Sequence, residues 1–465
     1  WAARTDWLQG FLGHTDRGAR SAMARMVGVA ARGMGSQEAA ALLCSLRGRF
    51  GAKRFEDADG ALRAASFAAA QRRARASAAG AVIDEAEQVA IQEVANAMLE
   101  LLPRQKGAAV PAIAAGAAPS PAELQGTAAL GLGYIGLTGP LPLADSNAID
   151  AAVARVALLL KAPDSPVVSC AATSLGYIAA GEPARDAVGE ACVGALFGEK
   201  LNKNEGVQFS IGEALAMAFG GAEGRLPVCV ETILGGEFGS LAQCPEFAQG
   251  VSADQDTDAS GAQVDIMDAD AGEEGAPAEA SRSHCVGVQR FLLDELFAKH
   301  VYDSRANARA SSTVWLLSVI RFCGAYSAGA QEALPEAQEA FGQLLGDPHE
   351  LTSEMSSRGM SIVYTLGGPA IRARLVQDLV DSLSGKVKRN RRVKVGADTE
   401  VFTAGSLGET PDGKGLSTYK ELCSLAAEMG KPDLVYKFMD LANHQASLKS
   451  ARGAAFGAMG VAAQA

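Results

Sequence analysis

The stretch NAIDAAVARVALLLK (residues 147–161), followed by APDSPVVSCAATSLGYIAA (162–180), decides the fold. Its first part places four apolar residues on one stripe at helical spacing, namely Ile149, Val153, Val156 and Leu160. The Pro-Asp-Ser-Pro run at 163–166 then ends the helix and forms a turn. A second helix follows, and its predicted buried face carries Ala171, Leu175 and Ile178. Neither helix can bury its stripe alone, so stacked antiparallel pairs are predicted.

The helix pair recurs along the chain. Aspartate or asparagine precedes a small-residue-rich helix at Asp16, Asp164, Asn204, Asn307, Asp347 and Asn443. The spacing is 40 residues from Asp164 to Asn204 and again from Asn307 to Asp347, close to the period of about 40–47 residues of HEAT and armadillo units. Twelve residues beyond the turns stand Gly28, Gly176, Ala216, Val319, Gly359 and Ala455, and five of these six are small enough for close helix approach. We therefore predict an all-α fold, an α-α superhelix (HEAT/armadillo-type solenoid): a right-handed stack of eight to ten pairs, curved into an arc.

Composition excludes several classes of function. The net charge of −11 argues against a general nucleic-acid binder, which needs a basic face. The eight cysteines are scattered without a C-x-x-C pair and the five histidines are isolated, so we expect reduced core thiols and no metal site. No apolar run is long enough for a membrane span, and no signal peptide opens the chain. The chain begins and ends within helical patterns, and we interpret it as a piece of a longer protein.

Two segments interrupt the repeats. We predict HEAT-type repeats over 1–248, 284–383 and 419–465, a disordered acidic insert over 249–283, and a basic and Gly-rich excursion over 384–418. The insert contains nine acidic residues from Asp254 to Glu279 and no lysine or arginine before Arg282, a pattern typical of disorder. Either a solvated loop or an acidic docking segment for a basic partner explains it. Residues 103–122 are predicted as a further Pro/Ala/Gly loop.

The excursion begins with six positive charges within nine residues: Lys386, Lys388, Arg389, Arg391, Arg392 and Lys394. A solvated loop, a nuclear-import signal or a contact to an acidic protein surface explains this run; nucleic-acid binding is disfavoured because no aromatic residues are interleaved. The segment VKVGADTEVF (393–402) could form a small hairpin. In the Ala-rich region 58–100, the arginines Arg72, Arg73 and Arg75 are predicted to form an exposed face.

One motif resembles a nucleotide site. Residues 408–415 nearly fit the phosphate loop G-x-x-x-x-G-K-[ST], but Gly415 stands where Ser or Thr would bind Mg²⁺. Pro411 also removes a backbone N–H from the loop. A tight turn explains Pro-Asp-Gly better. Ser406 lacks the first glycine of a nucleophile elbow, which is Ala404 here. We predict no catalytic residues, no cofactor and no enzyme activity.

The run VFTAGSLGETPDGKGLSTYKELCSLAAEMGKPDLVYKFMDLANHQASLKSARGAAFG (401–457) resembles the central region of the proteasome adaptor and scaffold protein family. VQFSIGEAL (207–215), STVWLLSVIR (312–321) and SRGMSIVYTLG (357–367) are similar to the same family. The resemblance implies a non-enzymatic HEAT-repeat adaptor that binds the regulatory and core particles of the proteasome, and bridges or stabilises them. It further implies vesicle or motor adaptors as partners, no direct membrane insertion, and a cytoplasmic and nuclear location.

The candidate partner contacts lie on the excursion or directly after it: Asp412, Lys414, Tyr419 and Lys420 near the Pro-Asp-Gly turn, with Lys388, Arg389, Arg391 and Arg392 of the basic run. Residues that only shape the loop would give the same pattern. Two other classes of function stay open. A HEAT-type nuclear-transport receptor would also be acidic, and a nucleotide-dependent enzyme would use the near-fit phosphate loop.

Overall fold

The computed structural model describes residues 5–104, 121–182, 186–220, 233–234, 278–375, 387–388 and 391–392, with 278–286 and the four strand residues described by backbone alone. The chain divides into two compact units, one of residues 1–247 and 281–300 and one of residues 248–280 and 301–465. The described elements of the first unit are helical: α1 (Thr5–Gln9), α2 (Arg17–Arg32), α3 (Ser36–Arg47), α4 (Phe55–Ala78), α5 (Glu85–Leu101), α6 (Ala122–Leu137), α7 (Ser146–Leu158), η2 (Leu159–Lys161), α8 (Ser165–Gly181), α9 (Asp186–Phe197), α10 (Glu205–Gly220), α13 (Ala278–Glu295) and η4 (Leu296–His300).

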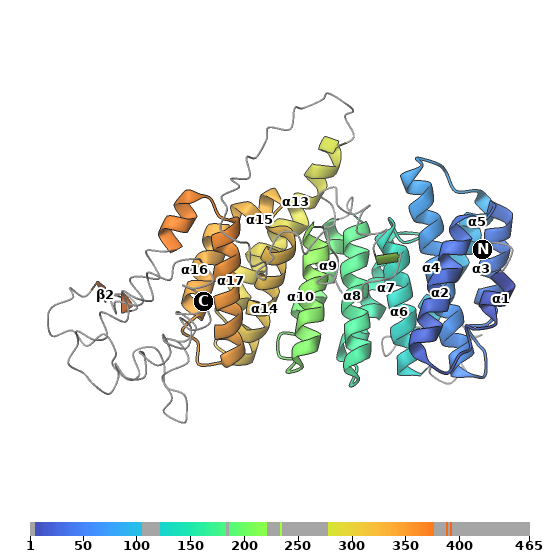
Figure 1. Cartoon of the computed structure of the whole chain (residues 1–465), viewed down its shortest axis with the longest axis horizontal. Coiled ribbons are helices and arrows are strands. Elements are labelled where there is room, and N and C mark those ends of the chain that lie inside the picture. The colour runs from blue at the N-terminus through green and yellow to red at the C-terminus, as the bar shows by residue number, and fades with distance from the viewer. Residues whose placement is uncertain are drawn as a thin grey trace, which may run out of the picture. The chain divides into compact units, whose positions relative to one another are not determined.

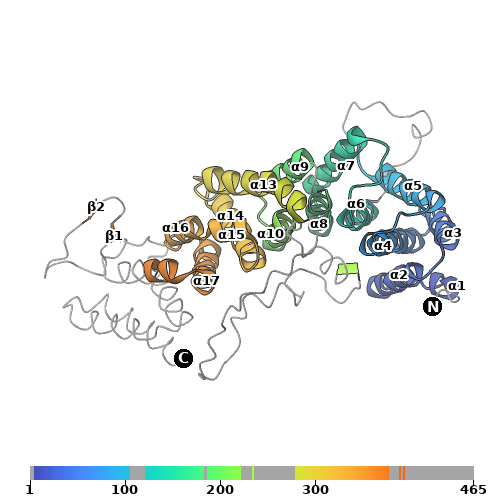
Figure 2. The ribbon, with the colours of Figure 1, turned by 90° about the horizontal axis from the view of Figure 1, so that it is seen from above.

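The helices of the first unit form two rows (Figures 1 and 2). Helices α2, α4, α6, α8 and α10 pack on one another in chain order and form the row that we call the inner row. Helices α3, α5, α7 and α9 lie beside them in the other row. Each helix of the second row packs on an inner-row helix next to it in sequence, as in a stack of helix pairs. The predicted α-α solenoid is therefore confirmed.

The stripes predicted from residues 147–181 are buried as expected. All four apolar residues of the first stripe are at most 8% exposed, and the three of the second are at most 1% exposed. The turn between the helices ends at Asp164, which directly precedes α8. Asn204 likewise precedes α10, and its side chain accepts a hydrogen bond from the Val207 amide at 3.1 Å. Helices α8 and α10 thus begin 40 residues apart, at Ser165 and Glu205.

Glycines set the close spacing of the inner row. At Gly176 in α8, an added Cβ would lie 2.6 Å from the carbonyl oxygen of Ala214 in α10. At Gly28 in α2, it would lie 2.7 Å from the Cβ of Phe67 in α4. Real Cβ atoms essentially never approach other heavy atoms this closely, so these positions need glycine. Both stand twelve residues beyond a turn aspartate, as the repeat alignment predicted.

The second unit contains α14 (Ala306–Cys323), α15 (Ala328–Glu332), α16 (Leu334–Leu344) and α17 (Glu350–Leu366). Helix α17 packs on α14 and on α16. Trp315 and Phe341 are fully buried in this unit. An added Cβ on Gly359 of α17 would lie 2.5 Å from the Phe341 ring, which explains the small residue expected at this position of the repeat.

One predicted repeat boundary is wrong. Asn307 is the second residue of α14 rather than a residue of the preceding turn. The turn residue is Asp303, whose carboxylate accepts a hydrogen bond from the Arg305 amide at 3.0 Å. Asp347 makes the equivalent bond with the His349 amide at 2.9 Å, as its predicted turn position requires. The repeat from Asp303 to Asp347 is therefore longer than 40 residues.

Of the two segments predicted to interrupt the repeats, 249–283 and 384–418, the structure describes only a few residues. Helix α13 begins at Ala278, inside the segment predicted as the acidic insert (249–283), because the alanine and glutamate at 278–280 favour a helix. Strand β1 (Val387–Lys388) pairs antiparallel with β2 (Arg391–Arg392), with Val387 opposite Arg392 and Lys388 opposite Arg391. The hairpin predicted at 393–402 and the repeats predicted over 419–465 lie outside the described residues. Within the described part, every helix is too short or too polar to cross a lipid bilayer.

Two alanine substitutions test the close packing. Gly176→Ala should lower the free energy of unfolding by about 1–3 kcal/mol, because its Cβ would meet the Ala214 backbone. Gly194→Ala in α9 is the matched control, since nothing lies within 4 Å of the added Cβ. It should raise stability by about 0.5–1 kcal/mol through helix propensity. Urea denaturation followed by circular dichroism measures both, and equal effects at the two positions would contradict the packing argument.

Candidate partner-binding surface

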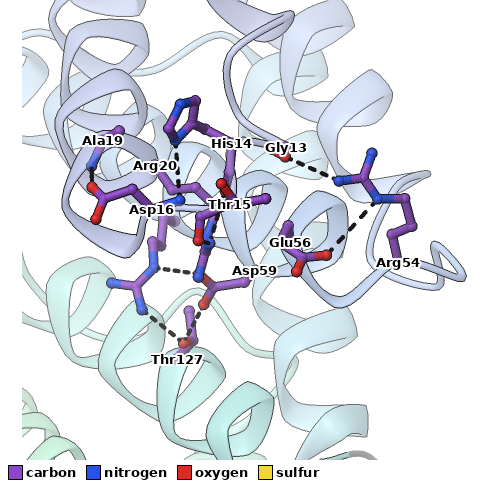
Figure 3. Close-up of polar contacts among 11 residues, drawn as sticks. Gly13, His14, Thr15, Asp16, Ala19, Arg20, Arg54, Glu56, Asp59 and Thr127 are labelled. Atoms are coloured by element: carbon purple, nitrogen blue, oxygen red, sulfur yellow. Dashed lines mark hydrogen bonds and ion pairs between the residues drawn. The ribbon is translucent and has the colours of Figure 1, made fainter.

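A buried carboxylate joins three inner-row helices. Asp59 of α4 accepts a hydrogen bond from Arg20 of α2 at 2.9 Å and from Thr127 of α6 at 2.7 Å (Figure 3). Arg63, one turn further along α4, bonds Asp59 at 3.0 Å and Thr127 at 3.2 Å. The side chains of Arg20 and Asp59 are 5% and 1% exposed. Burial opposes ionisation of Asp59, but the bonds from Arg63, Thr127 and Arg20 and the charge of Arg63 outweigh it and hold the pKa of Asp59 below its ordinary value.

Arg20 also forms hydrogen bonds with the loop that precedes its own helix. Its Nη1 donates to the carbonyl oxygens of His14 and Thr15 at 2.8 and 2.9 Å (Figure 3). A cation in the first turn of a helix is disfavoured by the helix dipole, and these acceptors and Asp59 offset that cost.

The second unit repeats the arrangement. Arg309, the fourth residue of α14 as Arg20 is of α2, donates to the carbonyl oxygens of Asp303 and Ser304, both at 2.9 Å. Its Nε bonds Asp347 in the following turn at 2.6 Å. In α10 a glutamine takes the fourth position, and Gln208 donates to the carbonyl oxygens of Glu199 and Asn202. The sequence analysis did not identify these residues. The two arginines could have been recognised by their position in the first turn of a helix, where the helix dipole disfavours a cation that has no partner.

The prediction that Arg72, Arg73 and Arg75 form an exposed face is wrong for Arg72 and Arg73. Arg72 is buried, forms a bidentate pair with Glu87 of α5, and donates to the carbonyl oxygen of Met34 at 2.6 Å. Arg73 donates to the Pro140 carbonyl oxygen at 2.6 Å, and burial lowers the pKa of Arg73 to about 10 although the Glu182 carboxylate partly offsets it. Arg75 is exposed and bonds the Arg32 carbonyl oxygen. Carbonyl groups that follow a helix accept these cations well, which a charge pattern alone does not reveal.

The residues proposed as partner contacts are not brought together by the described structure. Asp412, Lys414, Tyr419, Lys420 and Arg389 lie outside the described residues, as does the near-fit phosphate loop at 408–415. Lys388, Arg391 and Arg392 belong to the two-stranded ladder of β1 and β2. These contacts stay predictions.

The described residues offer no metal centre. No group of three or more His, Cys, Asp or Glu side chains in this part of the chain is arranged to hold a metal ion. Burial raises the pKa of the Cys192 thiol to about 12, so this cysteine is a core residue as expected. Cys323 is buried too, whereas Cys44 is exposed on α3 and does not fit the expectation of a core thiol.

The fold and its surfaces define a class of protein. Helix pairs stacked in two rows, tied by polar contacts between neighbours, are an α-solenoid of HEAT type, which presents extended surfaces to other molecules.

Three curated proteins share a segment with this chain. The human "Proteasome adapter and scaffold protein ECM29" is 44% identical over 172 residues, which cover 37% of this chain and 9% of that protein. The Drosophila melanogaster "Proteasome-associated protein ECM29 homolog" is 42% identical over 159 residues, covering 34% and 8%. The Saccharomyces cerevisiae "Proteasome component ECM29" is 34% identical over 173 residues, covering 36% and 9%. The chain is thus similar to ECM29 proteins over about a third of its length, and the shared segment spans less than a tenth of these relatives' length.

No protein-family model matches the chain. Among solved structures, the karyopherin Kap121p bound to the extreme C-terminus of the phosphatase Cdc14p is similar with a TM-score of 0.42 and 9% identity, covering 99% of this chain and 42% of that one. Kap95p in its structure with RanGDP gives a TM-score of 0.42 and 10% identity, covering 99% and 47%. Similarity at this level supports no choice of function.

The Asp59 network generates a pH-dependent prediction. Asp59→Asn should lower the free energy of unfolding at pH 7 by about 3–5 kcal/mol, because it leaves Arg20 buried without its carboxylate. The folded-state pKa of Asp59 lies below 3.8, its ordinary value, so the stabilisation is complete above that pH and is lost as the pH falls through the folded-state pKa. The difference between the variant and the wild type should therefore shrink below about pH 4.

Denaturation midpoints between pH 7 and pH 3 measure this difference. Asp294→Asn is the control, since its carboxylate is 73% exposed and 3.7 Å from Arg290. It should change stability by less than about 0.5 kcal/mol. A pH-independent cost of Asp59→Asn would show that the carboxylate charge is not what stabilises the network.

Proposed function

We propose that this chain is a non-enzymatic scaffold segment that binds the proteasome and bridges or stabilises its regulatory and core particles. The observation that carries the proposal is the 44% identity over 172 residues to a human protein named as a proteasome adapter and scaffold. The names of the Drosophila and yeast relatives also connect them with the proteasome.

The geometry suits such a role. In the first unit each helix pair packs on the next pair along the inner row, so the surface extends with every repeat while the core stays small. An extended surface of this kind can touch two subcomplexes at once, as a bridging function needs. Binding in this proposal depends on surface shape and charge, and no chemical step is assigned. A cytoplasmic and nuclear location, and vesicle or motor adaptors as additional partners, belong to the same proposal.

A pull-down tests this function. The tagged chain should retain purified proteasomes, and separated core and regulatory particles would show which of them it touches. Reversing two charges of the predicted contact set, with Lys414→Glu and Lys420→Glu, should reduce retention about tenfold if each lost contact costs about 0.7 kcal/mol. The matched control reverses two exposed lysines of the first unit, with Lys53→Glu and Lys203→Glu, and should retain proteasomes like the wild type.

The outcomes separate the function from its proposed residues. Absence of retention by the wild-type chain would contradict the scaffold proposal for this segment. Retention that is unaffected by the Lys414 and Lys420 substitutions would keep the function and remove these two residues from it. Capture of a GTP-loaded Ran-type GTPase in place of proteasomes would favour a nuclear-transport receptor.

A further inference from the structure

A histidine of η4 lies in contact with the end of α9. His300 is the last residue of this π-helical turn and is 7% exposed. Its ring packs on that of Phe197, the last residue of α9, with 4.6 Å between the two ring centroids. The Nζ atom of Lys200, in the turn after α9, lies 3.4 Å from Nδ1 of His300. The imidazole ring therefore joins η4 to α9, and all three residues belong to the first unit.

The contact between Lys200 and His300 requires a neutral imidazole. An ammonium group has three N–H donors and no acceptor, so Nδ1 of His300 accepts through its lone pair, and the neutral ring carries its proton on Nε2. A lysine side chain is ordinarily charged throughout the pH range in which histidine titrates. A proton on Nδ1 would therefore place two cations 3.4 Å apart, and burial of the ring adds to the cost. Acid thus replaces an attraction with a repulsion at this point.

Carboxylates close to this contact in the sequence already pair with other cations. These pairs are Glu199 with Lys161 of η2, Asp294 with Arg290, Glu295 with Lys299, and Asp303 with Arg305. In α9, the acidic residues Asp186 and Glu190 precede Phe197 by about two turns or more. Burial raises the pKa of the Cys192 thiol to about 12, so this group stays neutral. A protonated His300 would have to displace a lysine or an arginine to gain one of the paired carboxylates.

The end of α9 gives little further stabilisation to a positive charge. Its last four carbonyl oxygens, from Gly194 to Phe197, accept hydrogen bonds from the amides of residues 198–200. Lys200 stands three residues beyond the helix, where a cation already benefits from the helix dipole. A proton on His300 would add a second cation at the same end, so the helix dipole offsets little of the repulsion between them.

We propose that the contact between Lys200 and His300 is a pH-sensitive switch, which holds η4 against α9 at neutral pH and releases it in mild acid. The opened form accepts a proton on His300 that the closed form resists, so a falling pH favours opening. An ordinary histidine has a pKa of about 6.5, so the stabilisation by the contact is complete above that pH and is lost as the pH falls below it. Release would loosen the last element of the first unit, directly before the chain continues into the second unit at Val301. The proposal does not depend on proteasome binding.

Hydrogen–deuterium exchange of the full chain tests the switch. A peptide that contains Leu296–His300 reports how often η4 opens, after correction for the effect of pH on chemical exchange. Between pH 7.5 and pH 5.5 the opened fraction of the wild type should rise about tenfold, because an ordinary histidine is protonated about ten times more often than it is neutral at pH 5.5. A peptide from α7, which contains no histidine, should show no such rise.

Two variants identify the groups responsible. His300→Gln replaces the imidazole with a side chain that does not titrate, so the tenfold rise should disappear. Lys200→Glu replaces the opposing cation with a carboxylate that pairs with protonated His300, so the trend should reverse and η4 should be better protected at pH 5.5. The matched control, His14→Gln, changes an exposed histidine in the loop before α2, whose Nδ1 accepts a hydrogen bond from the Asp16 amide at 3.0 Å. It should leave the tenfold rise at η4 unchanged.

Each variant is compared with itself at two pH values, so a general loss of stability does not imitate the expected result. A rise of wild-type size in His300→Gln or in Lys200→Glu would overturn the proposal. So would a wild-type chain whose η4 is equally or better protected at pH 5.5 than at pH 7.5. The proteasome pull-down is a separate measurement, and failure of either one leaves the result of the other standing.

Discussion

The fold depends on how one buried carboxylate is shared. The Asp59 side chain is 1% exposed, so its ionised form requires Arg20, Arg63 and Thr127 at bonding distance. Because these partners come from α2, α4 and α6, the requirement fixes the relative position of three successive helices. Hydrophobic contact alone would let helices slide along each other, whereas directional bonds specify one register.

Glycines in the inner row determine which side chains of neighbouring helices come into contact. Gly28 allows α2 to approach α4 until Phe67 touches its backbone, and this approach brings Arg25 over the Phe67 ring. Gly133 similarly lets α6 approach Ser174 of α8, which helps place Tyr134 and Tyr177 in contact. The contact of Arg25 with Phe67 and that of Tyr134 with Tyr177 thus depend on the glycines that let the helices approach, as well as on the aromatic residues themselves.

The repeat architecture could be predicted from sequence because apolar spacing and turn residues are local signals. The stripe of Ile149 and Val153, and the role of Gly176, followed from periodicity and small size. The pairing of Arg20 with Asp59 could not be foreseen, since it joins residues 39 positions apart and depends on the distance between two helices. For the same reason Arg72 was predicted to be exposed, although Glu87 and the carbonyl oxygen of Met34 after α2 hold its guanidinium in a buried position. The candidate contacts at 412–420 were predicted because the segment at 384–418 does not fit the repeat, and they lie outside the described residues.

Hydrogen bonds and ion pairs are distributed unevenly along the inner row, and this affects how the first unit bends. Helices α2, α4 and α6 are joined by the buried Asp59 network, whereas α8 and α10 are joined by the Gly176 contact and by two bonds outside the core, between Ser169 and Ser210 and between Asn204 and Ser165. Directional bonds resist shear, while small-residue contacts allow two helices to tilt with little loss of energy. A load applied along the first unit would therefore bend it more readily between α8 and α10 than within the block formed by α2, α4 and α6.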